Sequence, residues 1–154
     1  MSTQTSAPAR DALTAGAAPR RGLLTAAATT AATATVANLA IYALADALVD
    51  VPDRFTPLQP GSVVFMTILG VALAAGFLRV LAGRVPRPVA TFRRIVPVAL
   101  VLSLIPDIGI WASGAYEGAA EAQTVLPLMA MHVVAAAASW LLLPRPFEGT
   151  SRRA

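Results

Sequence analysis

Residues 23–45 read LLTAAATTAATATVANLAIYALA, a run of 23 residues without a charged side chain. An α-helix needs about 20 predominantly apolar residues to cross the hydrocarbon core of a bilayer, so this stretch is long enough to span. The apolar core of a cleaved signal peptide has about 7 to 15 residues, which is shorter than this stretch. We therefore interpret residues 23–45 as an uncleaved first transmembrane helix.

Three further apolar stretches follow along the chain, at residues 61–83, 95–115 and 124–143. Over all 154 residues, 56% are hydrophobic and 13% are charged, and the mean hydropathy is +0.67. This hydrophobicity excludes a disordered chain, and the absence of cysteine excludes a disulfide scaffold and thiolate metal sites. The sequence predicts an all-α fold, an integral membrane bundle of four transmembrane helices.

The segments outside these stretches are short. Residues 1–21 have no hydrophobic period and predict a disordered cytoplasmic tail, and residues 145–154 predict a second cytoplasmic tail. The four-helix domain then covers residues 22–144. Within it, residues 46–60 carry three Asp and three Pro and predict a loop. The three Asp lack the spacing of an EF-hand, which favours a solvated acidic loop over a calcium site.

The basic residues are all arginine, and eleven of the twelve fall on one side of the predicted bundle. Three lie in the N-terminal tail, five between Arg79 and Arg94, and three in the C-terminal tail. Arg54 alone lies on the other side, together with Asp46, Asp50, Asp53, Glu117 and Glu121. Because cytoplasmic loops carry an excess of Lys and Arg, we expect a multi-pass protein of a bacterial plasma membrane with both termini in the cytoplasm. Arginines that flank apolar runs do not form a recognition stripe, so no nucleic-acid partner is expected.

Each predicted span contains one conspicuous polar residue: Asn38, Thr67, Asp107 and His132 in order. A carboxylate inside a bilayer costs about 2.5 to 3.5 kcal/mol, so Asp107 should be paired, protonated or hydrated. His132 is the one ionisable group at the same depth. The candidate ligand or proton-handling site is therefore Asp107 and His132 together with Asn38, Tyr42 and Thr67, and Asn38 and Tyr42 are the expected extra hydrogen-bond partners of the pair. Two interpretations stay open: polar contacts that hold helices together at about 1 kcal/mol each, or a site that handles a proton or a ligand.

At intervals of three and four residues, each polar residue has small or polar neighbours on the same side of its helix. These stripes predict the faces that point into the bundle. The predicted stripes are Thr35, Asn38 and Tyr42; Thr67, Gly70 and Ala74; Ser103, Asp107, Trp111 and Gly114; and His132, Ala135 and Ser139. Pro106 should also loosen the third helix, because proline removes one backbone hydrogen bond.

Catalytic and metal-binding patterns are scarce in the sequence. One histidine and one intramembrane aspartate are too few for a closed zinc site, so we expect no metal and no cofactor. A haem shared between chains, with His132 and Met129 or Met131 as ligands, is the remaining alternative. The sequence contains no phosphate-binding loop, nucleophile elbow or zincin motif, so an enzyme is not expected.

Two short motifs point to a family. SLIPD at residues 103–107 and MHVVAA at residues 131–136, within four spans from Arg21 to Leu143, resemble a family of small actinobacterial membrane proteins known as a domain of unknown function. The resemblance implies a four-helix membrane fold and no particular activity.

The expected function is that of a small multi-pass membrane protein of unassigned activity, an accessory or assembly element. Its expected partners are the lipid bilayer and either a second copy of the chain or another membrane protein. The alternative is a small transporter or proton-linked carrier that uses Asp107 and His132.

Overall fold

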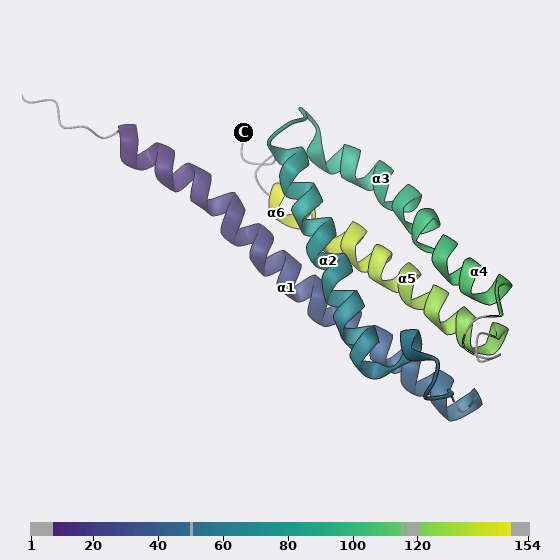
Figure 1. Cartoon of the computed structure of the whole chain (residues 1–154). Coiled ribbons are helices and arrows are strands. Elements are labelled where there is room, and N and C mark those ends of the chain that lie inside the picture. Colours follow the sequence, from purple (N-terminus) through teal and green to yellow (C-terminus); the bar gives the residue numbers. More distant parts are fainter. Residues whose placement is uncertain (1–7, 50, 115, 117–120, 149–154) are drawn as a thin grey trace, which may run out of the picture.

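The computed structural model describes residues 8–49, 51–114, 116 and 121–148, in which all the regular elements are helices (Figure 1). They are α1 (Pro8–Val49), η1 (Thr56–Leu58), α2 (Pro60–Ala82), α3 (Pro88–Ser103), α4 (Ile105–Ala112), α5 (Ala122–Leu142) and α6 (Arg145–Glu148). Four segments of the described chain are long and apolar enough to cross a membrane: Arg21–Val49, Pro60–Ala82, Pro88–Ala112 and Ala122–Glu148. The predicted all-α bundle with four membrane spans is confirmed.

The first helix is longer than the sequence analysis predicted. It begins at Pro8, so residues 8–21 continue the helix where a disordered tail was expected. Proline is tolerated in a first helical turn, where its missing N–H has no partner, and the alanines that follow it are the best helix formers. The candidate membrane span in this helix, Arg21–Val49, contains the predicted span of residues 23–45.

The third span is divided into two helices. Helix α3 ends at Ser103 and α4 begins at Ile105, directly before Pro106. Proline lacks an N–H donor, so the Leu102 carbonyl four residues before Pro106 receives no helical hydrogen bond from it, which accounts for the break. The Leu104 N–H still donates to the Leu100 carbonyl at 3.2 Å, and the Ile108 N–H donates to the Leu104 carbonyl at 3.1 Å. The predicted loosening at Pro106 is therefore confirmed as a local interruption of the helix.

Helix α1 packs against α2 and α5, whereas on the other side α3 lies against α2 and α5, and α4 lies against α5 (Figure 1). Buried apolar side chains form two clusters. One contains Ala45, Val51, Phe55, Leu58, Val63, Val125 and Met131. The other contains Leu23, Ala34, Val71, Ala75, Leu78, Leu81, Phe92 and Leu143. The first cluster joins α1, α2 and α5, and the second joins α1, α2 and α3, with Leu143 directly after α5.

The inward face of α2 differs from the predicted stripe. Thr67 is buried as predicted, but the positions that continue its face are Val71, Ala75 and Leu78. Gly70 is exposed, and a methyl group built on it would meet nothing within 4 Å. Aliphatic side chains fill this helix interface, so the glycine is left on the outer surface.

The inward face of α4 also differs in its last turn. Asp107 is buried, whereas Trp111 is 50% exposed. Gly114 follows the end of α4 with a φ of +63°, a left-handed conformation that glycine adopts at helix ends without steric cost. Glycine is therefore favoured at position 114 because of the positive φ angle, and not because two helices approach closely there.

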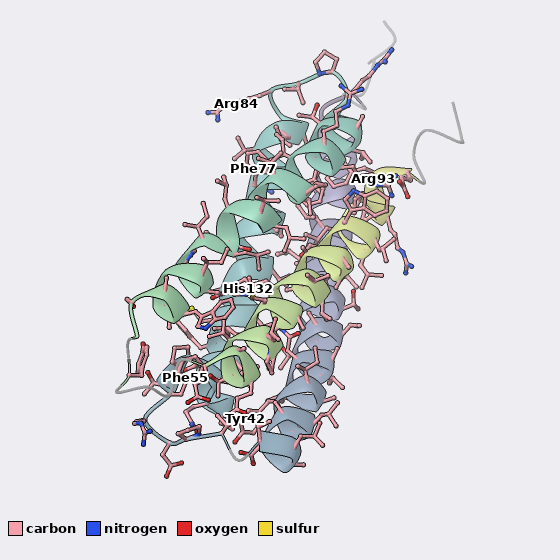
Figure 2. The ribbon with its side chains drawn as sticks, turned by 90° about the vertical axis from the view of Figure 1, so that its right-hand side faces the viewer. Tyr42, Phe55, Phe77, Arg84, Arg93 and His132 are labelled. Carbon is pink, nitrogen blue, oxygen red and sulfur yellow. The ribbon has the colours of Figure 1, made fainter. Side chains whose placement is uncertain are left out.

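The two ends of the bundle carry different charges. The arginine-rich end comprises the last turn of α2, the α2–α3 connection, the start of α3 and α6, with Arg79, Arg84, Arg87, Arg93, Arg94 and Arg145. The opposite, acidic end carries Asp46, Asp53 and Glu121, and Arg54 there donates from Nε to the Tyr116 carbonyl at 3.3 Å. In Figure 2, Arg84 and Arg93 lie at one end of the bundle and Phe55 at the other.

Candidate functional site

The centre of the candidate site is the contact between α4 and α5. Asp107 lies in the first turn of α4, directly after the helix break, and its side chain faces α5. His132 lies near the middle of α5, and Figure 2 places it between the two charged ends of the bundle. Because the third span is interrupted at Leu104, Asp107 lies in the first turn of a separate helix, where it is the first polar side chain.

The predicted contact between Asp107 and His132 is present. His132 Nδ1 lies 3.2 Å from Asp107 Oδ2, which is within the range of an ion pair when the imidazole is protonated. His132 Nδ1 also lies 3.0 Å from the Leu128 carbonyl, so the carbonyl and the carboxylate compete for one N–H. Asp107 Oδ2 is buried and, among the described residues, accepts no aligned hydrogen bond. We therefore treat the contact as electrostatic and not as a well-formed hydrogen bond.

The two partners differ in their access to the surroundings. The Asp107 side chain is 5% exposed, whereas the His132 side chain is 34% exposed. A buried carboxylate next to a partly exposed imidazole can exchange a proton with it. Chemically, the pair can act as a tie that depends on charge or as a site that loads and releases one proton.

A second polar pair joins α1 to α2. Asn38 Nδ2 donates to Thr67 Oγ1 at 2.9 Å, and both residues are buried. Asn38 Oδ1 and Thr35 Oγ1 are also buried, and neither has a hydrogen-bond partner in the described part of the chain. This pair is neutral, so it can hold two helices together without a change of charge.

Four of the five predicted site residues therefore form two separate pairs, and the fifth, Tyr42, belongs to neither. Asn38 and Thr67 contact each other and make no hydrogen bond to Asp107 or His132. Tyr42 packs against the apolar cluster around Phe55 and makes no hydrogen bond within the described residues. Among the described residues, Asn38 and Tyr42 therefore do not form the predicted extra hydrogen bonds to the Asp107–His132 pair.

A third polar cluster, at the arginine-rich end, was not predicted. Arg93 Nη2 lies 2.8 Å from Glu148 Oε1, and its guanidinium carbon lies 5.0 Å from the centre of the Trp140 ring. Trp140 Nε1 donates to the Arg93 carbonyl at 3.1 Å. The signal that could have identified the cluster is Pro97, because a proline in a helix deprives the carbonyl four residues earlier of its donor.

The candidate metal ligands of the sequence analysis do not gather in the structure. Among the described residues, no group of three or more His, Cys, Asp or Glu side chains lies close enough to hold a metal ion. Met131 is buried in the apolar cluster around Phe55. Of the acidic loop, Asp46 and Asp53 are exposed, whereas Asp50, like Glu117, lies outside the described residues.

Comparisons with known proteins place the chain in a family. Neither the curated proteins nor the solved structures contain a significant match. A family model covers residues 14–148, which is most of the chain and includes all four spans, the Asp107–His132 contact and the Arg93 cluster. The chain therefore belongs to the family of unknown function DUF6069, in agreement with the resemblance seen in the sequence.

Proposed function

We propose that this chain is a non-catalytic accessory or assembly element of a bacterial plasma membrane. The proposal rests on one observation: both polar pairs within the spans join neighbouring helices. Large apolar side chains such as Phe65, Leu73 and Val101 are exposed on the outside of the bundle, where lipid or another membrane protein can cover them. We propose as partners the bilayer and either a second copy of the chain or another membrane protein.

We further propose that both termini are in the cytoplasm. The described arginines gather at the end of the bundle that contains the α2–α3 connection and α6. The positive-inside rule assigns such an end to the cytoplasm. Single cysteines at Asp53 and Pro86, both exposed in connections at opposite ends, test the orientation, because the chain has no native cysteine. An impermeant thiol reagent applied to intact cells should label the cysteine at position 53 and spare the one at position 86, and the reverse pattern would mean the opposite orientation.

The Asp107–His132 contact serves, in this proposal, to hold α4 on α5. Helix α4 has eight residues and follows a break, so it depends on contacts with α5. Asp107→Asn keeps the size and the hydrogen-bonding groups of the side chain. Because Asn carries no charge, a structural tie that depends on charge predicts a lower free energy of unfolding for this variant in detergent, and a cellular phenotype that weakens only as far as the protein is destabilised.

A proton-linked carrier is the second candidate, and one observation favours it. Both members of the pair are titratable, and Asp107 Oδ2 is buried without an aligned hydrogen bond among the described residues. A carrier of this kind needs a group that loads and releases a proton. Asp107→Asn should then fold normally but abolish the phenotype, and Thr67→Val, which alters the neutral pair, is the matched control that should preserve it.

A further inference from the structure

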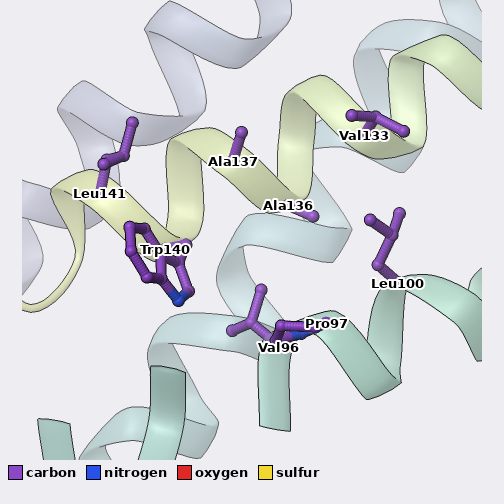
Figure 3. A pocket seen from close by; sticks show the side chains of 8 residues that line it. All are labelled: Val96, Pro97, Leu100, Val133, Ala136, Ala137, Trp140 and Leu141. Atoms are coloured by element: carbon purple, nitrogen blue, oxygen red, sulfur yellow. The ribbon is translucent and has the colours of Figure 1, made fainter. Parts of the chain in front are cut away.

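A groove lies between α3 and α5 on the side of the bundle that faces away from α1 (Figure 3). Its walls include Val96, Pro97 and Leu100 from α3 and Ala136, Ala137 and Trp140 from α5. The hollow is an open groove with a volume of about 390 Å³. Every side chain that lines it is predominantly apolar, so an extended hydrocarbon chain matches its chemistry.

The groove has a fixed wall at its arginine-rich end. Pro97 has no N–H, so the carbonyl of Arg93 in the preceding turn lacks its usual helical donor. Trp140 supplies that donor from α5, with an Nε1–O distance of 3.1 Å. The indole is thereby held across the two helices, and 38% of the residue remains exposed.

This end of the groove belongs to the arginine-rich end of the bundle. The Arg93 guanidinium lies over the Trp140 ring, with its carbon 5.0 Å from the ring centre. Arg94 follows in α3, and Arg145 begins α6, the helix that also carries Glu148. Among the described residues, Glu148 is the one carboxylate paired with Arg93, so the three arginines and one glutamate leave a net charge of +2.

We propose that this groove binds an acidic phospholipid, with an acyl chain between α3 and α5 and the phosphate at Arg93. Guanidinium groups bind phosphate oxygens through paired hydrogen bonds, and basic pockets between transmembrane helices suit acidic headgroups. Tryptophan is also favoured at the depth where headgroup and acyl chain meet. The Glu148 carboxylate forms an ion pair with Nη2 of Arg93, so it competes with the lipid phosphate for the same guanidinium group.

Trp140 makes the proposal measurable, because it lines the groove and the chain has one other tryptophan. The Trp111→Phe variant leaves Trp140 as the sole reporter. This full-length variant is reconstituted in phosphatidylcholine vesicles that contain either brominated phosphatidylglycerol or brominated phosphatidylcholine, since bromine quenches a tryptophan that it contacts. One arginine near an acidic lipid contributes about 1 kcal/mol, so the relative association of the acidic lipid should be about fivefold higher.

Three variants in the Trp111→Phe background distinguish a specific lipid site at Arg93 from a general attraction of acidic lipids to the basic end of the bundle. Arg93→Gln should reduce the preference to nearly one. Arg84→Gln removes the same charge from the same end of the bundle but outside the groove, so it should keep the preference (Figure 2). Glu148→Gln should raise the preference above that of the parent, because it removes the competing carboxylate.

Equal quenching by the two lipids in the Trp111→Phe protein would overturn the proposal. An equal loss in Arg84→Gln and Arg93→Gln would do the same, because it would reveal a general attraction of the basic end. If Arg93→Gln does not fold, Glu148→Gln decides the matter, since it leaves Arg93 in place. An unchanged lipid preference in that variant would contradict the assignment of Arg93 as the phosphate partner.

Discussion

The two polar pairs inside the bundle hold helices whose packing differs. Asn38 and Thr67 are 2% and 6% exposed and join α1 to α2, two long helices that also share a large apolar interface. Asp107 and His132 join the eight-residue α4 to α5, and the His132 side chain is 34% exposed. In an apolar 18-residue window of the second span, 28% of the residues are buried, compared with 11% in such a window of the third span. Where packing is extensive, a neutral contact adds to it; where packing is sparse, a charged contact carries more of the attachment.

Removal of the imidazole should have the largest effect. His132→Ala leaves the Asp107 carboxylate buried without its partner, and an unpaired aspartate in a membrane costs about 2.5 to 3.5 kcal/mol. The free energy of unfolding in mixed micelles should fall by an amount approaching that value. A loss below about 0.5 kcal/mol would mean that charge does not hold α4 in place.

Overpacking the other region should have an intermediate effect. Ala75 is 8% exposed and belongs to the apolar cluster around Leu78, so Ala75→Leu should cost about 1 to 3 kcal/mol. Gly70→Leu is the matched control on the same helix, because a side chain there meets nothing within 4 Å. Unfolding in mixed micelles compares the two, and equal losses would show that the face of α2 is misassigned.

Loss of the neutral hydrogen bond should have the smallest effect. Thr67→Ala leaves the Asn38 amide without its acceptor, and interhelical hydrogen bonds in membranes contribute about 0.6 kcal/mol on average and at most about 1.7. Thr67→Ser keeps the hydroxyl and should remain close to the native stability. The same unfolding assay measures both variants, and a loss in Thr67→Ala that exceeds that of His132→Ala would invert the comparison between the two regions.

Much of the architecture could be predicted from the sequence. Predominantly apolar runs of about 20 residues define the spans, because a bilayer leaves few alternatives to a helix. The Asp107–His132 contact was predictable for a similar reason: one buried acid needs a partner, and the spans offer one imidazole.

The faces of the helices were harder to predict. In α2, the small residue Gly70 and the large residue Val71 lie about 100° apart, and both are apolar enough to face either lipid or protein. Lipid is as apolar as a helix interface, so hydrophobicity does not separate the inside from the outside. The Arg93–Trp140 contact could not be predicted from Pro97 alone. It also requires the observed register between α3 and α5, which neither segment encodes by itself.

The central claim is that charge couples α4 to α5 more strongly than the neutral pair couples α1 to α2. A double-mutant cycle with Asp107→Ala, His132→Ala and the double variant tests it, and the matched cycle uses Asn38→Ala and Thr67→Ala. We predict that the double variant Asp107→Ala/His132→Ala is more stable than His132→Ala alone, because it no longer buries an unpaired carboxylate. Its coupling energy should exceed that of the Asn38–Thr67 cycle. Additivity within about 0.3 to 0.5 kcal/mol at Asp107 and His132 would contradict the claim.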